Sequence, residues 1–185
     1  MSETKYFPTV EAIEKASQVL DEILEPTPFQ RNANLSDIYE AEIYLKREDL
    51  QMVRSYKIRG AYNKIRTIDP ELVTNGIVCA SAGNHAQGVA FSCSKLKIMG
   101  SIFMPVTTPR QKIEQVRMFG KEFIEIILTG DTFDAANTAA IEYAKVNEKT
   151  FIPPFDDPKV MEGQGTIGKE ILAQSSVKLD YIFVP

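Results

Sequence analysis

The sequence predicts an α/β fold in which open parallel sheets carry helices on both faces. Short apolar runs of strand length alternate with amphipathic segments of about 10 to 15 residues. Glycine, proline, asparagine and aspartate separate these segments, as turn and cap residues do. The composition, 44% hydrophobic and 25% charged over 185 residues, is that of a folded globular protein rather than a disordered chain.

The first 67 residues predict a helix, a strand and a second helix. Apolar side chains recur at helical spacing over 10–24, and Pro26 and Pro28 end that run. The segment 41–46 (AEIYLK) is typical of a strand. A second helix is expected over 55–67, beginning in a Ser-Tyr-Lys turn.

From residue 76 the alternation becomes regular. Asp131 or Thr132 can cap the last of the helices in this region. Strands joined through helices pair in parallel, with right-handed crossovers that cover both faces of the sheet. Strands are expected over 76–80, 100–104, 122–128 and 150–152, and helices over 84–96, 109–119 and 133–146.

Pro153 and Pro154 interrupt the alternation, which suits a crossing between two lobes. A last helix is expected over 160–174. A last strand is expected over 181–184, because apolar residues without alternation are typical of a buried, central strand. The chain is therefore expected to be truncated, with a small lobe of residues 76–152 and an incomplete large lobe of residues 1–75 and 153–185.

Charge and cysteine content argue against several classes of partner. The net charge is −4, and no basic run is present that would bind a phosphate backbone. Cys79 and Cys93 lack metal-ligand spacing and are typical of reduced, buried thiols. No uncharged stretch approaches membrane-spanning length, and the N-terminal residues have no signal-peptide core. We expect a cytoplasmic protein that binds neither nucleic acid nor a membrane and holds no metal.

Three segments carry candidate chemistry, and the first is Ser-Tyr-Lys-Ile-Arg-Gly-Ala at 55–61. Lys57 lies at the start of a predicted helix, where the helix dipole disfavours an ammonium and would lower the pKa of the amine. The neutral amine is the form that condenses with an aldehyde. An ordinary solvent-facing lysine is the alternative interpretation.

The second segment, Ser-Ala-Gly-Asn-His-Ala-Gln-Gly at 81–88, joins a predicted strand to a predicted helix. Such a turn leaves backbone N–H groups free for a carboxylate or a phosphate, and Ser81 and Asn84 add side-chain hydrogen bonds. The alternative is a tight turn at Gly83 with Ser81 or Asn84 as the helix cap. His85 is the only histidine, and no carboxylate at a suitable spacing identifies it as a base.

The third segment, Gly-Gln-Gly-Thr-Ile-Gly at 163–168, is expected to open the last helix. A glycine-rich helix start does not by itself identify a functional site, and close packing of helices explains the glycines equally well.

Taken in order, these segments resemble the fold type II (tryptophan synthase β-like) pyridoxal-phosphate (PLP) enzymes, most closely the threonine and serine dehydratases. SYKIRGA resembles the lysine segment of that family, and SAGNHAQGVA resembles its substrate loop. GQGTIGKE resembles the segment that returns the chain to the large lobe, and PPFDDP before it also resembles the dehydratases. The resemblance covers nearly the whole chain.

The resemblance implies roles for individual residues. Lys57 would form the Schiff base with PLP and, once displaced by substrate, abstract the α-proton. Asn84 would hydrogen-bond the ring hydroxyl of the cofactor, and Ser81, Gly83, Asn84 and His85 would hold the substrate carboxylate. The implied enzyme is a lyase that converts L-threonine into 2-oxobutanoate and ammonia, the first step towards isoleucine, and its full-length form is expected to be a homo-oligomer.

Two kinds of alternative stay open. Within the family, serine dehydratase or serine racemase is the main one. Serine racemases typically carry a serine at the position of Ala82, whose hydroxyl serves the second face of the substrate; a methyl cannot do so, which favours a dehydratase. Ile58, in place of the aspartate typical of threonine and cysteine synthases, favours the same branch. From another class, the rival hypothesis is a catalytically dead fragment whose exposed segment 181–184 promotes association.

Two departures from the family pattern concern activity. The segment 51–54 lacks the proline that usually precedes the lysine. The glycine-rich loop that cradles the PLP phosphate, and the later serine or cysteine that meets the pyridine nitrogen, do not occur among these 185 residues. A phosphate dianion without its N–H donors loses its main anchor. We expect weak PLP retention and little or no dehydratase activity from the 185 residues alone.

Overall fold

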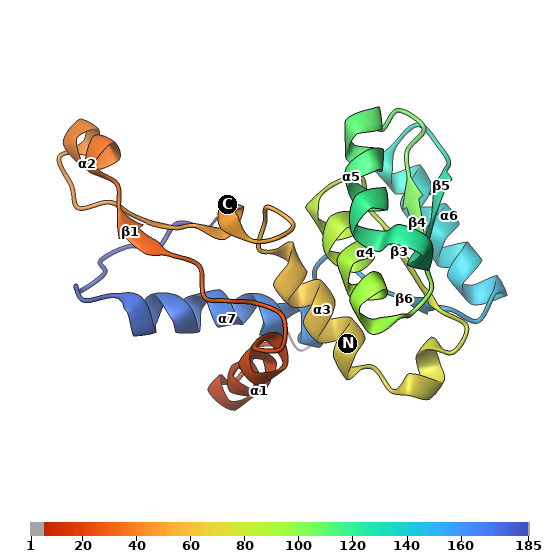
Figure 1. Cartoon of the computed structure of the whole chain (residues 1–185), viewed down its shortest axis with the longest axis horizontal. Coiled ribbons are helices and arrows are strands. Elements are labelled where there is room, and N and C mark those ends of the chain that lie inside the picture. Colours follow the sequence, from red (N-terminus) through yellow and green to blue (C-terminus); the bar gives the residue numbers. More distant parts are fainter. Residues whose placement is uncertain (1–5, 185) are drawn as a thin grey trace, which may run out of the picture.

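The computed structural model describes residues 6–184. Figure 1 shows two parts with helix α3 (Lys57–Thr67) between them, while helix α7 (Pro158–Gln174) extends from α3 to below strand β1 in this view. One part contains a parallel sheet and its covering helices. The other contains a small hairpin of strands and a short helix, α2 (Ala33–Tyr39).

The larger sheet has four strands, all parallel, in the order β5-β4-β3-β6. Every residue of the two central strands is buried, which explains their unbroken apolar runs. The predicted parallel sheet is confirmed, with strand bounds that differ from the prediction by no more than two residues. The strands are β3 (Ile77–Ala80), β4 (Gly100–Met104), β5 (Ile124–Leu128) and β6 (Thr150–Phe151).

Helices cover both faces of this sheet, as the alternation of strands and helices predicts. Successive strand residues point to opposite faces, so each face has its own core. Helices α4 (Asn84–Leu96) and α5 (Arg110–Gly120) pack on the face of Cys79 and Ile102. Helix α6 (Phe133–Val146) covers the other face, where its small residues Ala140 and Ala144 meet Val78, Ala80 and Phe103.

Polar side chains define where several helices begin. Thr132 accepts a hydrogen bond from the backbone of Ala135 and caps α6, which confirms one of the two predicted caps. Asp157 caps α7 in the same way, one residue before Pro158. The first helix, α1 (Val10–Leu20), is capped by Thr9 and ends four residues earlier than the apolar pattern indicates.

The second part was only partly predicted. Strand β2 (Tyr44–Lys46) lies within the expected segment and pairs antiparallel with β1 (Phe29–Arg31), which was not predicted. A three-residue strand is too short to show alternation, and its pairing depends on a partner distant in sequence. The Phe29 ring stacks on that of Tyr44, with centroids 5.3 Å apart. Short 3₁₀ helices occupy Glu48–Leu50, Pro70–Val73 and Lys121–Phe123.

Two sequence predictions about the C-terminal region are wrong. The segment 181–184 forms no strand, and its side chains are exposed, because no neighbouring strand among residues 6–184 pairs with it. The glycine-rich segment 163–168 does not open the last helix, which begins at Pro158. Gly163 is already within its second turn and packs against α3, as described below.

Candidate active site

Gly88 brings the start of α3 against α4. A Cβ at this position would lie 3.1 Å from the carbonyl oxygen of Lys57 and 3.2 Å from Cα of Ile58. Only a residue without a side chain allows so close an approach of two backbones without a shift. The last residue of the Ser-Ala-Gly-Asn-His-Ala-Gln-Gly octet therefore places Lys57 close to the start of α4.

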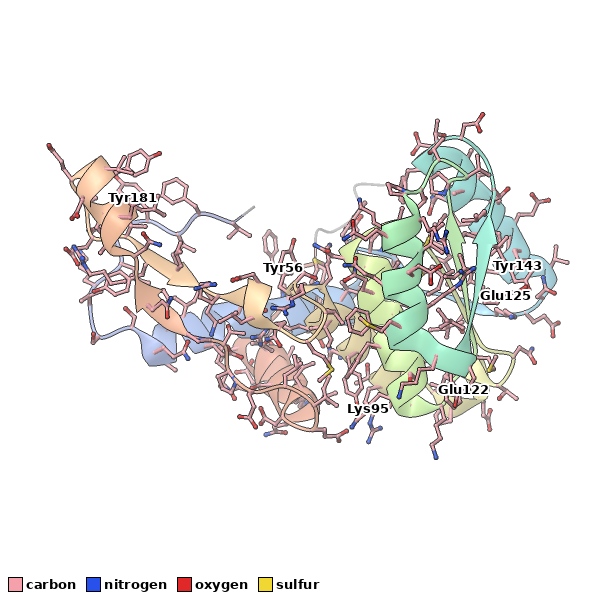
Figure 2. All side chains as sticks on the ribbon, turned by 45° about the horizontal axis from the view of Figure 1, so that its top comes forward. Tyr56, Lys95, Glu122, Glu125, Tyr143 and Tyr181 are labelled. Atoms are coloured by element: carbon pink, nitrogen blue, oxygen red, sulfur yellow. The ribbon has the colours of Figure 1, made fainter. Side chains whose placement is uncertain are left out.

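Lys57 is the first residue of α3, and its amine is half-buried. Nζ donates a hydrogen bond to the backbone oxygen of Pro154 at 2.8 Å and lies 5.5 Å from the centre of the Tyr56 ring. Burial lowers the pKa of the Lys57 amine, in the direction expected from the sequence. Figure 2 shows Tyr56 near the middle of the molecule, where its two parts meet.

The turn before α4 is held by Ser81. Its backbone N–H continues the ladder of the sheet by donating to Phe103 O at 3.0 Å, and its hydroxyl oxygen accepts from the N–H of Gly83 at 3.1 Å. Neither Ser81 nor Asn84 caps α4, so the cap interpretation of these residues is wrong. Gly83 occupies the N-cap position and no side chain replaces the missing hydrogen bonds there.

The start of α4 is suited to an anion. The first-turn N–H groups of a helix have no intrahelical partner, and the dipole favours negative charge beside them. Ser81 accepts a hydrogen bond from Gly83, so its own O–H remains available to donate. A Cβ at Gly83 would meet nothing within 4 Å, so there is open space at this turn, and Asn84 beside it is exposed.

His85 lies inside the protein rather than in the open site. It is 3% exposed, and Nε2 lies 3.1 Å from the backbone oxygen of Ile152. A carbonyl only accepts, so Nε2 carries the proton of this hydrogen bond. Nδ1 is then an acceptor, and it is buried without a partner among residues 6–184. Burial lowers the pKa of His85 to about 4, the charge of Lys57 acts in the same direction, and the bond to Ile152 opposes both. The neutral side chain has no further N–H to offer a carboxylate.

A single segment after β6 contacts both Lys57 and His85. Ile152 O accepts from the imidazole and Pro154 O accepts from the amine. Sequence reasoning placed a crossing at Pro153 and Pro154 but did not include this segment in the site. A backbone carbonyl leaves no signature in a sequence, so only the turn-forming prolines after an apolar strand could have drawn attention to it.

The third candidate segment supports α3 and does not join the site. A Cβ at Gly163 would lie 2.5 Å from the backbone oxygen of Arg59 and 2.8 Å from Cα of Gly60. Gly163 thus allows α7 to pack closely on α3, and a Cβ at Gly165 would lie 2.9 Å from Ile13 of α1, which agrees with the packing interpretation. The candidate site therefore consists of Lys57, the segment 81–85 and the segment 152–154.

Within residues 6–184, no helix is long and apolar enough to cross a membrane. In the same part of the chain, no three His, Cys, Asp or Glu side chains gather in a way that could hold a metal ion. Cys79 and Cys93 are both buried as free thiols, and burial raises the pKa of each.

A family model described as "Pyridoxal-phosphate dependent enzyme" matches residues 20–185. The chain belongs to this family. It is 58% identical over 174 residues to the biosynthetic L-threonine dehydratase of Bacillus subtilis, a match that covers 94% of this chain and 41% of that protein. The chain thus spans about two fifths of the length of this curated relative.

Solved structures of the family share the fold. The processed form of threonine deaminase isoform 2 from Solanum lycopersicum is 40% identical, with a TM-score of 0.81, over 94% of this chain and 51% of that one. Maize serine racemase is 27% identical, with a TM-score of 0.85, over 91% of this chain and 50% of that one. The predicted α/β fold of the PLP family is confirmed.

The residues of the site fit the cofactor of this family. An aldehyde needs an amine that is neutral at least part of the time, and the lowered pKa of Lys57 meets that requirement. Two polar atoms near Lys57 are buried without hydrogen-bond partners among residues 6–184: Ser55 Oγ, two residues before it in sequence, and Nδ1 of His85, whose ring is affected by the charge of Lys57. Such unpaired atoms are uncommon in folded proteins and are typical of a site that is completed by a ligand.

Proposed function

We propose that the protein is a PLP-dependent threonine ammonia-lyase, which converts L-threonine into 2-oxobutanoate and ammonia. One observation carries the proposal: the half-buried amine of Lys57 acts electrostatically on His85, in the first turn of α4, and the uncapped N-terminus of that helix can hold a carboxylate. An α-amino acid presents a carboxylate close to the carbon that must react. The similarity to the biosynthetic Bacillus subtilis dehydratase supports threonine as the substrate, and it supports a role of the reaction in the biosynthesis of isoleucine.

Lys57 is proposed to hold the cofactor through its amine and later to move a proton at Nζ. When bound, PLP withdraws electrons from the α-carbon of an amino acid and so acidifies its C–H bond. The neutral form of the amine, favoured by burial, can accept that proton at Nζ. Nζ must first leave the carbonyl oxygen of Pro154. Asn84, exposed at the start of α4, is proposed to hydrogen-bond the ring hydroxyl of the cofactor.

The carboxylate of the substrate is assigned to the turn before α4. The hydroxyl of Ser81 and the backbone N–H groups of Asn84 and His85 are the proposed donors, with Gly83 leaving the room. His85 contributes through its main chain, because its imidazole proton is already given to Ile152. Holding the carboxylate in this way orients the α-carbon toward one base, which is the arrangement that proton abstraction requires.

Ala82 favours a dehydratase over a racemase. Racemisation needs a proton donor or acceptor on each face of the α-carbon, and the methyl group of Ala82 can be neither. Removal of the β-hydroxyl after α-proton abstraction needs a base on one face only. Deuterium from solvent in recovered D-amino acid would instead favour the racemase alternative.

The organisation of the protein forms part of the proposal. We propose a small lobe of residues 76–152, supported by the self-contained parallel sheet, and a large lobe that includes residues 1–75 and 153–185. The reduced, buried thiols of Cys79 and Cys93 support a cytoplasmic location. A homo-oligomeric full-length form is proposed from the family resemblance alone.

Reductive labelling tests the central role of Lys57. The purified chain is mixed with PLP, reduced with borohydride and digested, and pyridoxyl-lysine is located by mass spectrometry. We expect selective labelling of Lys57 and little labelling of Lys64, which lies on the same helix but is paired with Asp157 at 2.8 Å. The Lys57→Ala variant should remain unlabelled. Labelling scattered over surface lysines, or none at all, would contradict the proposal.

A further inference from the structure

A buried cluster of charges lies on the opposite side of α3 from the site. The charge cluster consists of Lys46, Glu48, Arg59 and Glu170, which contribute two positive and two negative charges. The Arg59 side chain is 1% exposed and those of its two carboxylate partners are 11% and 18% exposed. Removing charges from water is expensive, so a cluster of this kind persists only where its partners are closely matched.

Arg59 uses both edges of its guanidinium in the charge cluster. Nε and Nη2 donate to the two oxygens of Glu48 at 2.9 and 2.8 Å. Nη1 and Nη2 donate to the two oxygens of Glu170 at 2.6 and 3.0 Å, and Nη1 also donates to Thr166 Oγ1 at 3.0 Å. Paired, planar hydrogen bonds fix the orientation of an arginine as well as its distance.

The charge cluster joins the two ends of the segment 48–59, which leads into α3 and contains Lys57. Glu48 and Arg59 stand at its ends, so their two hydrogen bonds close the chain over these residues. Within it, Arg54 has a positive φ of 61°, and Gln51 Nε2 and Ser55 Oγ are buried without hydrogen-bond partners among residues 6–184. An unfavourable backbone conformation of this kind persists only where surrounding contacts fix it, and the Glu48–Arg59 pair is one of those contacts.

Helix geometry couples the charge cluster to the amine. Lys57 and Arg59 are two residues apart, so their side chains leave α3 roughly 200° apart around its axis. One side of the first turn is fixed by Glu48 and Glu170, while the other side directs Nζ to Pro154. A shift or rotation of this turn would move the amine by a similar amount.

Stability alone is a poor explanation for the charge cluster. Buried ion pairs are often no more stabilising than well-packed apolar residues of the same volume, whereas they do restrict the geometry of what they join. We propose that Arg59, held by Glu48 and Glu170, is a positioning residue that sets the location of Lys57. The proposal rests on Lys57 being the reacting amine, as proposed above, but its test does not need the cofactor.

Competitive acetylation measures the environment of Lys57 directly. The folded chain receives trace acetic anhydride at a series of pH values, and mass spectrometry gives the extent of reaction at each lysine. Arg59→Lys keeps the charge but loses the planar fork, and Glu170→Gln removes one carboxylate. In both variants we expect Lys57 to become more hydrated, so that its titration midpoint rises towards that of an ordinary lysine. Each unit of rise lowers the neutral fraction at neutral pH about tenfold.

A matched control separates positioning from loss of stability. Val116→Ala removes two buried methyl groups from α5, in the core of the parallel sheet, which includes no residue of the charge cluster; it should lower the melting temperature without moving the Lys57 midpoint. An unchanged Lys57 midpoint in the folded Arg59 and Glu170 variants would overturn the proposal. If Arg59→Lys does not fold, the Lys57 midpoint of Glu170→Gln alone tests the proposal. The Glu170 carboxylate is partly exposed, so we expect this variant to fold. Failure of PLP labelling in the parent chain would count against the proposed function and leave this result standing.

Discussion

Burial and one hydrogen bond fix the charge state of His85. Its Nε2 donates to Ile152 O, and Nδ1 has no partner among the described residues. Protonation would place a positive charge and a second N–H in a region without an acceptor, beside the charge of Lys57. The folded chain therefore resists a proton that the unfolded chain accepts.

Stability should decrease as the pH falls from about 6.5 towards 4. The pKa of His85 is 6.5 in an unfolded chain and about 4 in the folded one, so the unfolded state binds more protons in this interval. This difference in pKa corresponds to a loss of about 3 kcal/mol in the free energy of unfolding once the pH has fallen to about 4. Urea titrations at pH 7, 5.5 and 4.5 measure this loss.

A His85→Gln variant provides the control for this prediction. Glutamine keeps an N–H donor for Ile152 but does not titrate, so the loss of stability between pH 7 and 5 should disappear. Because His85 is the only histidine, its ring protons give a single set of NMR signals. Titration of those signals near pH 6.5 in the folded protein would refute the assigned burial.

At the residue scale, the sequence identifies candidate functional side chains, but it does not show which groups they contact. Lys57 and the segment 81–88 were recognised from residue type, order and the small residues around them. The orientation of His85 was not, because burial depends on helix packing that brings Gly88 against α3. The two backbone carbonyl oxygens that accept hydrogen bonds from Lys57 and His85 could not be predicted, since every residue has such an oxygen.

At the scale of elements, α3 connects the site to the rest of the fold. It packs against α4 through Gly88 and against α7 through Gly60 and Gly163. A Cβ on Gly60 would lie 2.9 Å from the backbone oxygen of Val160, so the α3–α7 contact is also backbone to backbone. Small residues on both helices thus bring Arg59 within reach of Glu170.

Two glycines of α7 should respond in opposite ways to alanine. Gly163→Ala forces a methyl to within 2.5 Å of the Arg59 carbonyl, so we expect a loss of about 1 to 3 kcal/mol or more. Gly168→Ala meets no atom within 4 Å, and the better helix propensity of alanine should stabilise the chain by up to about 1 kcal/mol. Chemical denaturation of both variants measures the difference. Equal effects would show that α7 does not pack on α3 as described.

Most elements could be predicted because their signals are local. Alternating strands and helices from 76 to 152 carry apolar periodicity, turn residues and a cap at Thr132. Strand β1 depends on pairing with β2 and was missed, as was the seven-residue helix α2 between them. The glycines at 163–168 were expected at a helix start but lie inside α7, where the close contact of Gly163 with α3 outweighs the low helix propensity of glycine.

At the scale of the whole molecule, the structure of the segment 181–184 could not be predicted from its own sequence. Its apolar composition predicted a central strand, but a strand forms only where another strand satisfies its backbone. In the structure Tyr181 and Phe183 are 82% and 92% exposed, and the centroids of their rings lie 6.5 Å apart. Figure 2 shows Tyr181 at the end of the molecule opposite the four-stranded sheet.

This exposed segment should make the chain associate as its concentration rises. Four consecutive apolar side chains form a larger contiguous patch than single exposed residues do, and their burial between copies is favourable. Replacing Tyr181 and Phe183 with serine should return the chain to a monomer in sedimentation velocity over a range of concentrations. Val146→Ser, which removes one exposed apolar residue from α6, should leave association unchanged. A parent chain that stays monomeric at high concentration would show that the segment 181–184 does not promote association.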